Sequence, residues 1–303
     1  MTPRTPAPLS RRAALLAGAA LLAVPAGGCG AAGGPGSSAG SDATTVVASS
    51  YPLAFVVERV AAERIGSGDV ALENLVPPGA DSHDLELSPQ QVAELGAADL
   101  VVHLGGLQPA VDSALAQDPP EHLVDTAPLA DLGADPHFWL DPVRMVEVTR
   151  EVAGELAHVD PDGAGSYTSA AADLEEDLRA LDAEYSEALA GCAGATLVTS
   201  HEAFGYLAER YGLEQLGITG IDPHVEPSPA RLRQVVQTVS GRGVQTVFFE
   251  AAAGEGVAAA LADDLGVRTG VLHPIERVTR DEDYLGLMEA NLAALRDGLA
   301  CDA

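Results

Sequence analysis

The sequence predicts an α/β protein of two lobes, each a mainly parallel sheet flanked by helices, joined by one long rigid helix. From Thr44 onward, short apolar and β-branched runs alternate with segments of helical periodicity. One uninterrupted helical stretch follows near the middle of the chain, and the alternation restarts at Ala195. Strands separated by helices pair in parallel, so this order favours two sheets, with a cleft between them as the natural ligand site.

The first half contains four predicted strands and four predicted helices. The strands are 45–49, 70–76, 99–103 and 122–125, and the helices are 54–65, 89–96, 107–116 and 142–158. Val56, Val57 and Val60 lie on one side of the first helix. Ser88-Pro89 and Asp141-Pro142 each combine an N-cap with a proline in the first turn, which is typical of a helix start.

Residues 164–190 predict the connecting helix. They contain Ala, Leu, Glu, Asp and Arg in abundance, and after Gly165 neither Gly nor Pro occurs before Gly191. Leu174, Leu178, Leu181 and Tyr185 recur at spacings of three or four, as on an amphipathic helix. Such a helix would run about 40 Å, enough to connect two lobes.

The second half repeats the pattern of the first. The predicted strands are 195–199, 215–219, 244–249 and 267–272, and the predicted helices are 201–211, 229–240, 255–265 and 281–299. We therefore expect an N-terminal lobe at 44–160, the connecting helix at 161–190 and a C-terminal lobe at 191–303.

The first 29 residues predict an export signal. Arg4, Arg11 and Arg12 precede an apolar stretch of 12 residues, Ala13–Val24, which is too short to span a bilayer. Small residues lead directly to Cys29, as in bacterial lipoprotein signals, where the cysteine is lipidated. An ordinary cleaved signal is the alternative, and both the general and the twin-arginine export routes remain open. Residues 30–43, rich in Gly, Ser and Ala, predict a flexible tether.

The charge and the cysteines narrow the class of protein. The formal charge is −29, and all 16 basic residues are arginine, which argues against nucleic acid as a partner. Cys192 and Cys301 remain beyond the signal. Export implies an oxidising compartment and so favours a disulfide between them, with two free thiols as the alternative.

Four histidines follow the ends of apolar strand-like runs or lie in the loops beyond them: His83, His137, His201 and His273. The carboxyl ends of parallel strands meet at one edge of a sheet, where ligands bind. Four imidazoles gathered there would form a complete ligand set for a borderline divalent ion, above all zinc.

Several motifs around these histidines resemble the zinc/manganese solute-binding proteins of bacterial ABC transporters, in their zinc-uptake branch. The stretches that carry the resemblance are Ser50–Leu53, Val76–Asp84, Pro136–Pro142, Thr199–Tyr206, Gly220–Pro229 and Asp283–Leu292. The resemblance covers residues 44–299. It implies two α/β lobes joined by a rigid helix, with the metal between them on His83, His137 and His201.

The fourth metal-binding position departs from the family pattern. The family usually presents an aspartate or glutamate after a strand of the last lobe, whereas Leu272-His273-Pro274-Ile275 occupies the corresponding place here. His273 is therefore the predicted fourth ligand, with Glu250 or a water as rivals. Seven acidic residues are candidates to orient the imidazoles: Asp81, Asp84, Asp135, Asp141, Glu202, Asp222 and Glu250.

These features predict a monomeric extracytoplasmic receptor, lipid-anchored to the outer face of the cell membrane, that binds Zn²⁺ and delivers it to an ABC importer permease without catalysing a reaction. A manganese receptor or adhesin of the same fold is one alternative. An exported zinc hydrolase with Glu202 as general base is another. It requires an open coordination position, and the chain has no His-Glu-x-x-His helix.

Overall fold

The described part of the chain begins after the predicted signal. The computed structural model describes residues 43–250, 256–279, 282–299 and 301. The predicted signal peptide, Cys29 and residues 30–42 of the predicted tether lie outside the described residues. None of the helices within the described ranges has both the length and the hydropathy of a membrane span.

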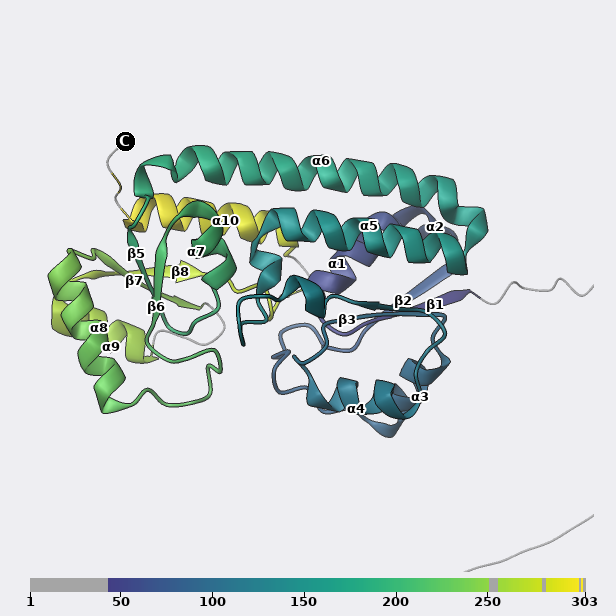
Figure 1. The fold of residues 1–303 in the computed structure, drawn as a ribbon, viewed down its shortest axis with the longest axis horizontal. Helices are drawn as coiled ribbons and strands as arrows, with labels where there is room; N and C mark the ends of the chain where they lie inside the picture. The colour runs from purple at the N-terminus through teal and green to yellow at the C-terminus, as the bar shows by residue number, and fades with distance from the viewer. Residues whose placement is uncertain (1–42, 251–255, 280–281, 300, 302–303) are drawn as a thin grey trace, which may run out of the picture. The chain divides into compact units, whose positions relative to one another are not determined.

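The first sheet consists of four parallel strands in the order β2-β1-β3-β4 (Figure 1). The strands are β1 Thr44–Ala48, β2 Val70–Asn74, β3 Leu100–His103 and β4 Leu123–Asp125. The accompanying helices are α1 Tyr51–Val60, α2 Ala62–Ser67, α3 Pro89–Ala97, α4 Pro109–Gln117 and α5 Pro142–Val159. Apolar side chains of α3 and α4 pack on one face of the sheet, and those of α1 and α5 pack on the other.

The second sheet repeats this arrangement with the order β6-β5-β7-β8, again entirely parallel. The strands are β5 Thr196–Thr199, β6 Glu214–Gly217, β7 Thr246–Glu250 and β8 Arg268–Leu272. The helices are α7 Gly205–Tyr211, α8 Pro229–Arg242, α9 Gly256–Leu265 and α10 Tyr284–Leu299. Side chains of α8 and α9 bury one face, while α10 packs against β8 from the other side. The predicted α/β class with two parallel sheets is therefore confirmed.

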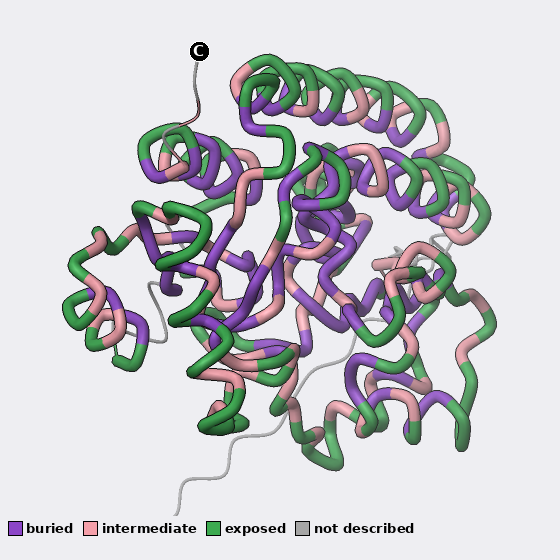
Figure 2. The backbone as a smooth tube through the Cα atoms, turned by 60° about the vertical axis from the view of Figure 1, so that its left-hand side comes forward, coloured by how far each residue is buried: buried purple, intermediate pink, exposed green. Residues whose placement is uncertain are grey.

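Helix α6, Ala164–Ala188, connects the two halves (Figure 1). It buries Leu174, Leu178, Leu181 and Tyr185 on one side, and buried and exposed residues alternate along it (Figure 2). Its apolar side packs against α1, α5 and α10, so one core extends from the first sheet to the second. The lobe boundaries at residues 160 and 190 stay a prediction, because this core is continuous across them.

Three helices that start with a polar residue followed by proline, α3, α5 and α8, have side-chain caps. Ser88 accepts a hydrogen bond from the Gln91 N–H, Asp141 from the Val143 N–H and Ser228 from the Arg231 N–H. The helix predicted at 54–65 is divided at Ala61 into α1 and α2, and the helix predicted to start at His201 begins instead at Gly205. Residues 201–204 bend away from the helix, and the Glu202 N–H bonds to the Gly220 carbonyl rather than within a helical turn.

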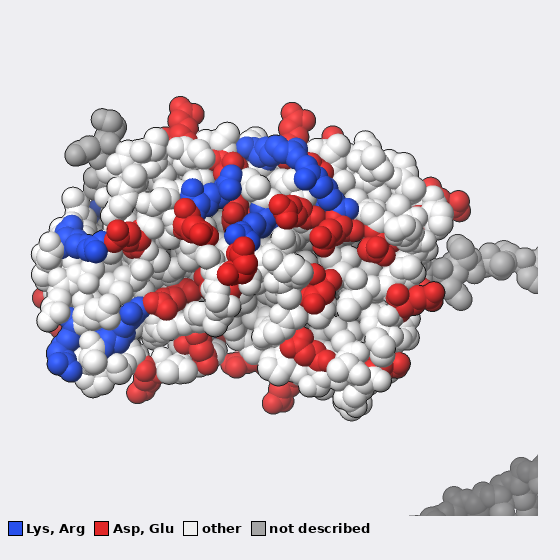
Figure 3. Space-filling model, in the orientation of Figure 1, with Lys and Arg blue, Asp and Glu red and all other residues white. Residues whose placement is uncertain are grey.

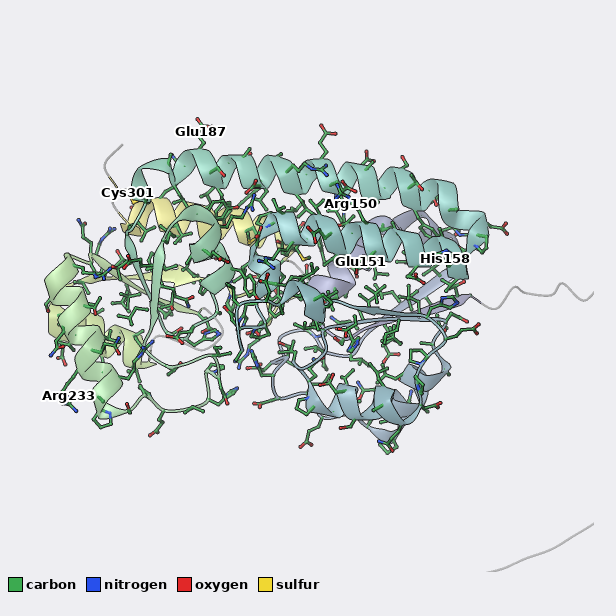
Figure 4. All side chains as sticks on the ribbon, in the orientation of Figure 1. Arg150, Glu151, His158, Glu187, Arg233 and Cys301 are labelled. Carbon is green, nitrogen blue, oxygen red and sulfur yellow. A yellow bond between two sulfur atoms is a disulfide. The ribbon has the colours of Figure 1, made fainter. Side chains whose placement is uncertain are left out.

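The predicted disulfide is present. Cys192 and Cys301 are bonded across 109 residues, with Cα atoms 5.1 Å apart. In Figure 4, Cys301 lies beyond the end of α10 and near the C-terminal end of α6, where Glu187 is labelled. The bridge therefore fastens the last helix to the start of the second sheet.

The acidic surface is partly balanced by local ion pairs. On the face shown in Figure 3, arginines over α5 and α6 lie among carboxylates. Arg150 and Arg179 share Glu175, and Arg210 joins Asp182 to Asp141, so these cations serve contacts within the chain.

Candidate metal centre

Three histidines reach the site from loops at the carboxyl ends of the sheets. His83 follows β2, His137 follows β4 and precedes a short turn at Phe138–Leu140, and His201 comes two residues after β5. The ring centroids of His83 and His137 are 5.5 Å apart, and those of His137 and His201 are 5.4 Å apart. The structure therefore brings together three of the four predicted histidines.

The Nε2 atoms of these three rings are buried and have no hydrogen-bond partner among the described residues. His137 and His201 are completely or almost completely buried, and the side chain of His83 is 15 % exposed. An unpaired buried nitrogen is costly unless something binds it. Three such nitrogens on neighbouring rings are typical of a site that holds a cation.

Glu276 completes the group from the last loop. Its Oε1 lies 2.8 Å from His83 Nε2 and 3.2 Å from His137 Nε2, and the residue is 4 % exposed. The separations are short, but the atoms are not aligned for hydrogen bonds. One ligand atom each from His83, His137 and Glu276 falls within 4.8 Å of the others, the spacing of atoms that share one ion.

The loop that carries Glu276 is fixed by contacts from distant parts of the chain. The Asn291 side chain accepts from the His273 N–H at 2.7 Å and donates to the His273 carbonyl at 2.8 Å. Trp139 Nε1 donates to the Pro274 carbonyl at 2.8 Å. Ile275 then adopts a φ of +61°, rare for a β-branched residue and typical of a functional turn.

The structure does not bring His273 into this group. His273 is half-buried and lines a cavity of about 220 Å³ with Glu250, Arg277 and Glu282. The sequence predicts the fourth ligand directly after the strand, whereas the turn at Pro274-Ile275 brings Glu276, three positions later, next to His83 and His137. The one feature of the sequence that pointed to Glu276 was the family's preference for a carboxylate at the fourth position.

Two carboxylates orient the imidazoles. Asp135 Oδ1 lies 2.7 Å from His137 Nδ1, and Glu250 Oε1 bonds His201 Nδ1. A carboxylate only accepts, so each neutral ring carries its proton on Nδ1 and directs the Nε2 lone pair into the site. Glu250, the predicted rival for the fourth position, is occupied in this way.

The other five acidic candidates have different partners. Asp81 accepts from the His83 backbone N–H at 2.9 Å, so it fixes the main chain of that residue rather than its ring. Asp84 contacts His224, Asp141 caps α5, Glu202 pairs with Arg231, and Asp222 accepts from the His224 N–H.

A tyrosine of the second half supports the loop before His137. The hydroxyl of Tyr206, on α7, accepts from the Leu132 N–H at 2.9 Å and lies 3.1 Å from the Asp135 carbonyl, to which it donates. Tyr206 is buried. Its contacts were not evident from the sequence, because the two segments are about 70 residues apart.

The electrostatics of the site favour protonated imidazoles at His137 and His83 in the absence of a metal. Burial alone would lower the pKa of His137, but the Glu276 and Asp135 carboxylates outweigh it and raise the pKa to about 9. Burial likewise opposes the influence of Glu276 on His83, whose pKa is raised. For Glu276 itself, burial would raise the pKa, yet His137 and His83 hold it well below its usual range.

The remaining histidines have local partners. His103, at the end of β3, has its pKa lowered by burial. His122 Nδ1 and His158 Nδ1 lie 3.2 and 3.5 Å from Glu155 carboxylate oxygens. His158 is in the last turn of α5, where Figure 4 labels it.

Comparison with known proteins identifies the family. The sequence profile described as "Zinc-uptake complex component A periplasmic" (ZnuA) matches residues 46–298. The chain belongs to this family. Within the ZnuA family, the zinc-binding lipoprotein AdcA of Streptococcus pneumoniae is 31 % identical over 280 residues, which cover 83 % of this chain and 55 % of AdcA. The high-affinity zinc uptake system protein ZnuA of Bacillus subtilis is 29 % identical over 286 residues, covering 85 % and 88 %.

Solved structures show the same fold. The Zn(II)-bound ZnuA-like domain of Streptococcus pneumoniae AdcA matches with a TM-score of 0.73 and 31 % identity, covering 85 % of this chain and 99 % of that one. The laminin-binding protein Lmb of Streptococcus agalactiae, described as a bifunctional protein with adhesin and metal transporting activity, matches with a TM-score of 0.73 and 31 % identity, covering 84 % and 99 %. The chain spans about half of full-length pneumococcal AdcA, 55 %.

Proposed function

We propose that this protein is an extracytoplasmic receptor that binds Zn²⁺ and delivers it to an ABC importer. The observation that carries the proposal is the approach of the buried Nε2 atoms of His83 and His137 to the buried carboxylate of Glu276, with the His201 ring 5.4 Å from that of His137. The sequence relationship to zinc-binding lipoproteins and zinc uptake proteins supports the same conclusion.

The proposed ligands are His83, His137, His201 and Glu276, with Glu276 in place of the His273 expected from the sequence. Three nitrogens and one oxygen suit a tetrahedral zinc ion, whereas manganese favours more oxygen ligands. The Glu276 carboxylate offsets part of the ion's charge directly. Asp135 and Glu250 offset more of it through the imidazoles that they hold.

This ligand set supports binding rather than catalysis. A zinc hydrolase needs a coordination position for water, and four protein ligands fill a tetrahedral shell. Glu202, the general base in the hydrolase alternative, forms an ion pair with Arg231. We therefore propose that zinc is cargo, and that the protein carries out no reaction.

We propose that the receptor is tethered to the outer face of the membrane through a lipid on Cys29, with residues 30–43 as a flexible link. The signal-like sequence and the name of the AdcA lipoprotein support this anchor. One chain supplies all four proposed ligands, which is consistent with a monomer. The partner is then an importer permease, which must separate the ligand-bearing loops to release the ion.

The test compares zinc binding by the wild type, Glu276→Gln and His273→Ala. Metal content after purification and competition with a chromophoric chelator give the stoichiometry and affinity. Glu276→Gln should lower zinc affinity by at least about a hundredfold, more than typical losses of a supporting residue. His273→Ala should stay within about twofold of the wild type, because His273 is not among the ligand atoms that the structure brings together.

Circular dichroism and thermal unfolding of the zinc-free variants control for misfolding. The reverse pattern, with His273→Ala losing zinc and Glu276→Gln retaining it, would reject the proposed ligand set. Stronger binding of manganese than of zinc in the same competition assay would favour the manganese receptor instead.

A further inference from the structure

Two of the proposed ligands lie on segments that touch each other directly. The segment 79–84 carries His83, and the segment 276–278 carries Glu276. The Gly79 N–H donates to the Val278 carbonyl at 3.0 Å, and the Ser82 hydroxyl lies 3.2 Å from Glu276 Oε1. Segments almost 200 residues apart thus form one wall of the site.

Asp81 is the point at which these segments are most closely tied. Its Oδ1 accepts from the His83 backbone N–H at 2.9 Å. Its Oδ2 pairs with the guanidinium of Arg277, the residue next to Glu276, and lies 3.1 Å from His224 Nε2. One carboxylate therefore contacts the backbone of one proposed ligand and the immediate neighbour of another.

The environment of Asp81 makes this pair stronger than an ordinary surface salt bridge. The Asp81 side chain is only 9 % exposed and that of Arg277 is 24 % exposed. Charge-assisted hydrogen bonds in such partly dry surroundings hold better than exposed pairs.

The outer side of the same cluster reaches solvent. His224, on the loop between β6 and α8, is 47 % exposed, and its Nε2 also lies 3.1 Å from Asp84, which is 69 % exposed. His224 thereby attaches a third loop to the His83 segment. Because it is half-exposed, we expect its contribution to be smaller than that of Arg277.

We propose that Asp81 is a positioning residue that holds the His83 segment against the Glu276 segment, and that the Asp81–Arg277 ion pair slows the release of bound zinc. This inference rests on the proposed function. Release requires the distance between these segments to grow, so the pair must break before the ion leaves. The Asp81–Arg277 ion pair affects the dissociation rate of zinc, since it forms while the His83 and Glu276 segments are in contact.

The test is the rate of zinc release into excess chelator, measured by stopped flow on the full chain. Asp81→Asn keeps an oxygen for the His83 N–H but removes the charge that holds Arg277. It should raise the dissociation rate about tenfold, as expected for the loss of one charged hydrogen bond. Arg277→Gln should act similarly, Arg277→Lys should recover part of the loss, and His224→Asn should change the rate about two- to threefold.

The double variant Asp81→Asn/Arg277→Gln distinguishes the loss of this one ion pair from a general weakening of the site. If the two residues act through one contact, the double variant releases zinc no faster than the faster single variant. Asp297→Asn is a matched control, because it removes the exposed Arg268–Asp297 pair at the other end of β8. It should leave the release rate unchanged.

The outcomes separate the two proposals. Wild-type protein that binds no zinc would reject the receptor function itself. If the wild-type protein binds zinc and Asp81→Asn releases it at the wild-type rate, only the proposed role of the Asp81–Arg277 ion pair would be overturned. The same holds if Asp81→Asn lowers the melting temperature but leaves the release rate unchanged, because Asp81 would then serve only stability.

Discussion

Zinc binding should release protons and strengthen steeply between pH 7 and pH 8. The perturbation is pH, and the responsible group is His137, whose pKa the Glu276 and Asp135 carboxylates raise to about 9 against the effect of burial. Zinc binds only neutral imidazole, so the proton and the ion compete for the same nitrogen. A raised pKa extends that competition upward, and affinity must therefore increase as pH rises toward 9 and fall on acidification.

The size of the effect follows from the neutral fraction of His137. With a pKa of about 9, this fraction is about 1 % at pH 7 and about 9 % at pH 8. Apparent zinc affinity should therefore rise about ninefold over this interval from His137 alone. The pKa of His83 is also raised, which adds to the change in the same direction.

The assay is competition with a chelator of known pH dependence, together with calorimetry at pH 7.5 in buffers of different ionisation enthalpy. We expect about one proton per zinc from His137. Asp135→Asn removes one of the groups that raise this pKa, so it should reduce the pH dependence. A dissociation constant that is equal at pH 7 and pH 8, with binding enthalpy independent of the buffer, would refute the reasoning.

Three further predictions concern the surroundings of the site. Asp135→Asn and Glu250→Gln should each weaken zinc binding about ten- to a hundredfold at fixed pH, because the imidazoles lose the groups that orient them. Chelator competition measures this loss, and unchanged zinc affinity in both variants would contradict the orienting role. Trp139 is the only tryptophan, and its ring lies 5.2 Å from that of His137, so its fluorescence should change on zinc titration and saturate at one equivalent; a spectrum insensitive to zinc would place the ion elsewhere. Cys192→Ser should lower the free energy of unfolding by about 4–5 kcal/mol in the chain-entropy model. Denaturant titration against the disulfide-intact wild type measures this change. A loss below about 1 kcal/mol would show that the disulfide hardly constrains the unfolded chain.

The sequence alone determined the architecture and three residues of the candidate site. Hydrophobic periodicity and capping residues are local properties, so they located nearly every strand and helix and the connecting helix α6. Parallel strands all present their carboxyl ends at one edge of a sheet. For this reason a histidine after such a strand, or in the loop beyond it, could be assigned to a common site before its neighbours were known.

Only the tertiary structure decided which residue of the last loop faces those histidines. The choice between His273 and Glu276 depends on Asn291, Trp139 and the positive φ of Ile275, none of which is expressed in local periodicity. The roles of Asp81 and Tyr206 likewise arise from contacts across about 70 to 200 residues. Side-chain direction in an irregular loop is set by such distant contacts, whereas the strand that precedes it is set by its own sequence.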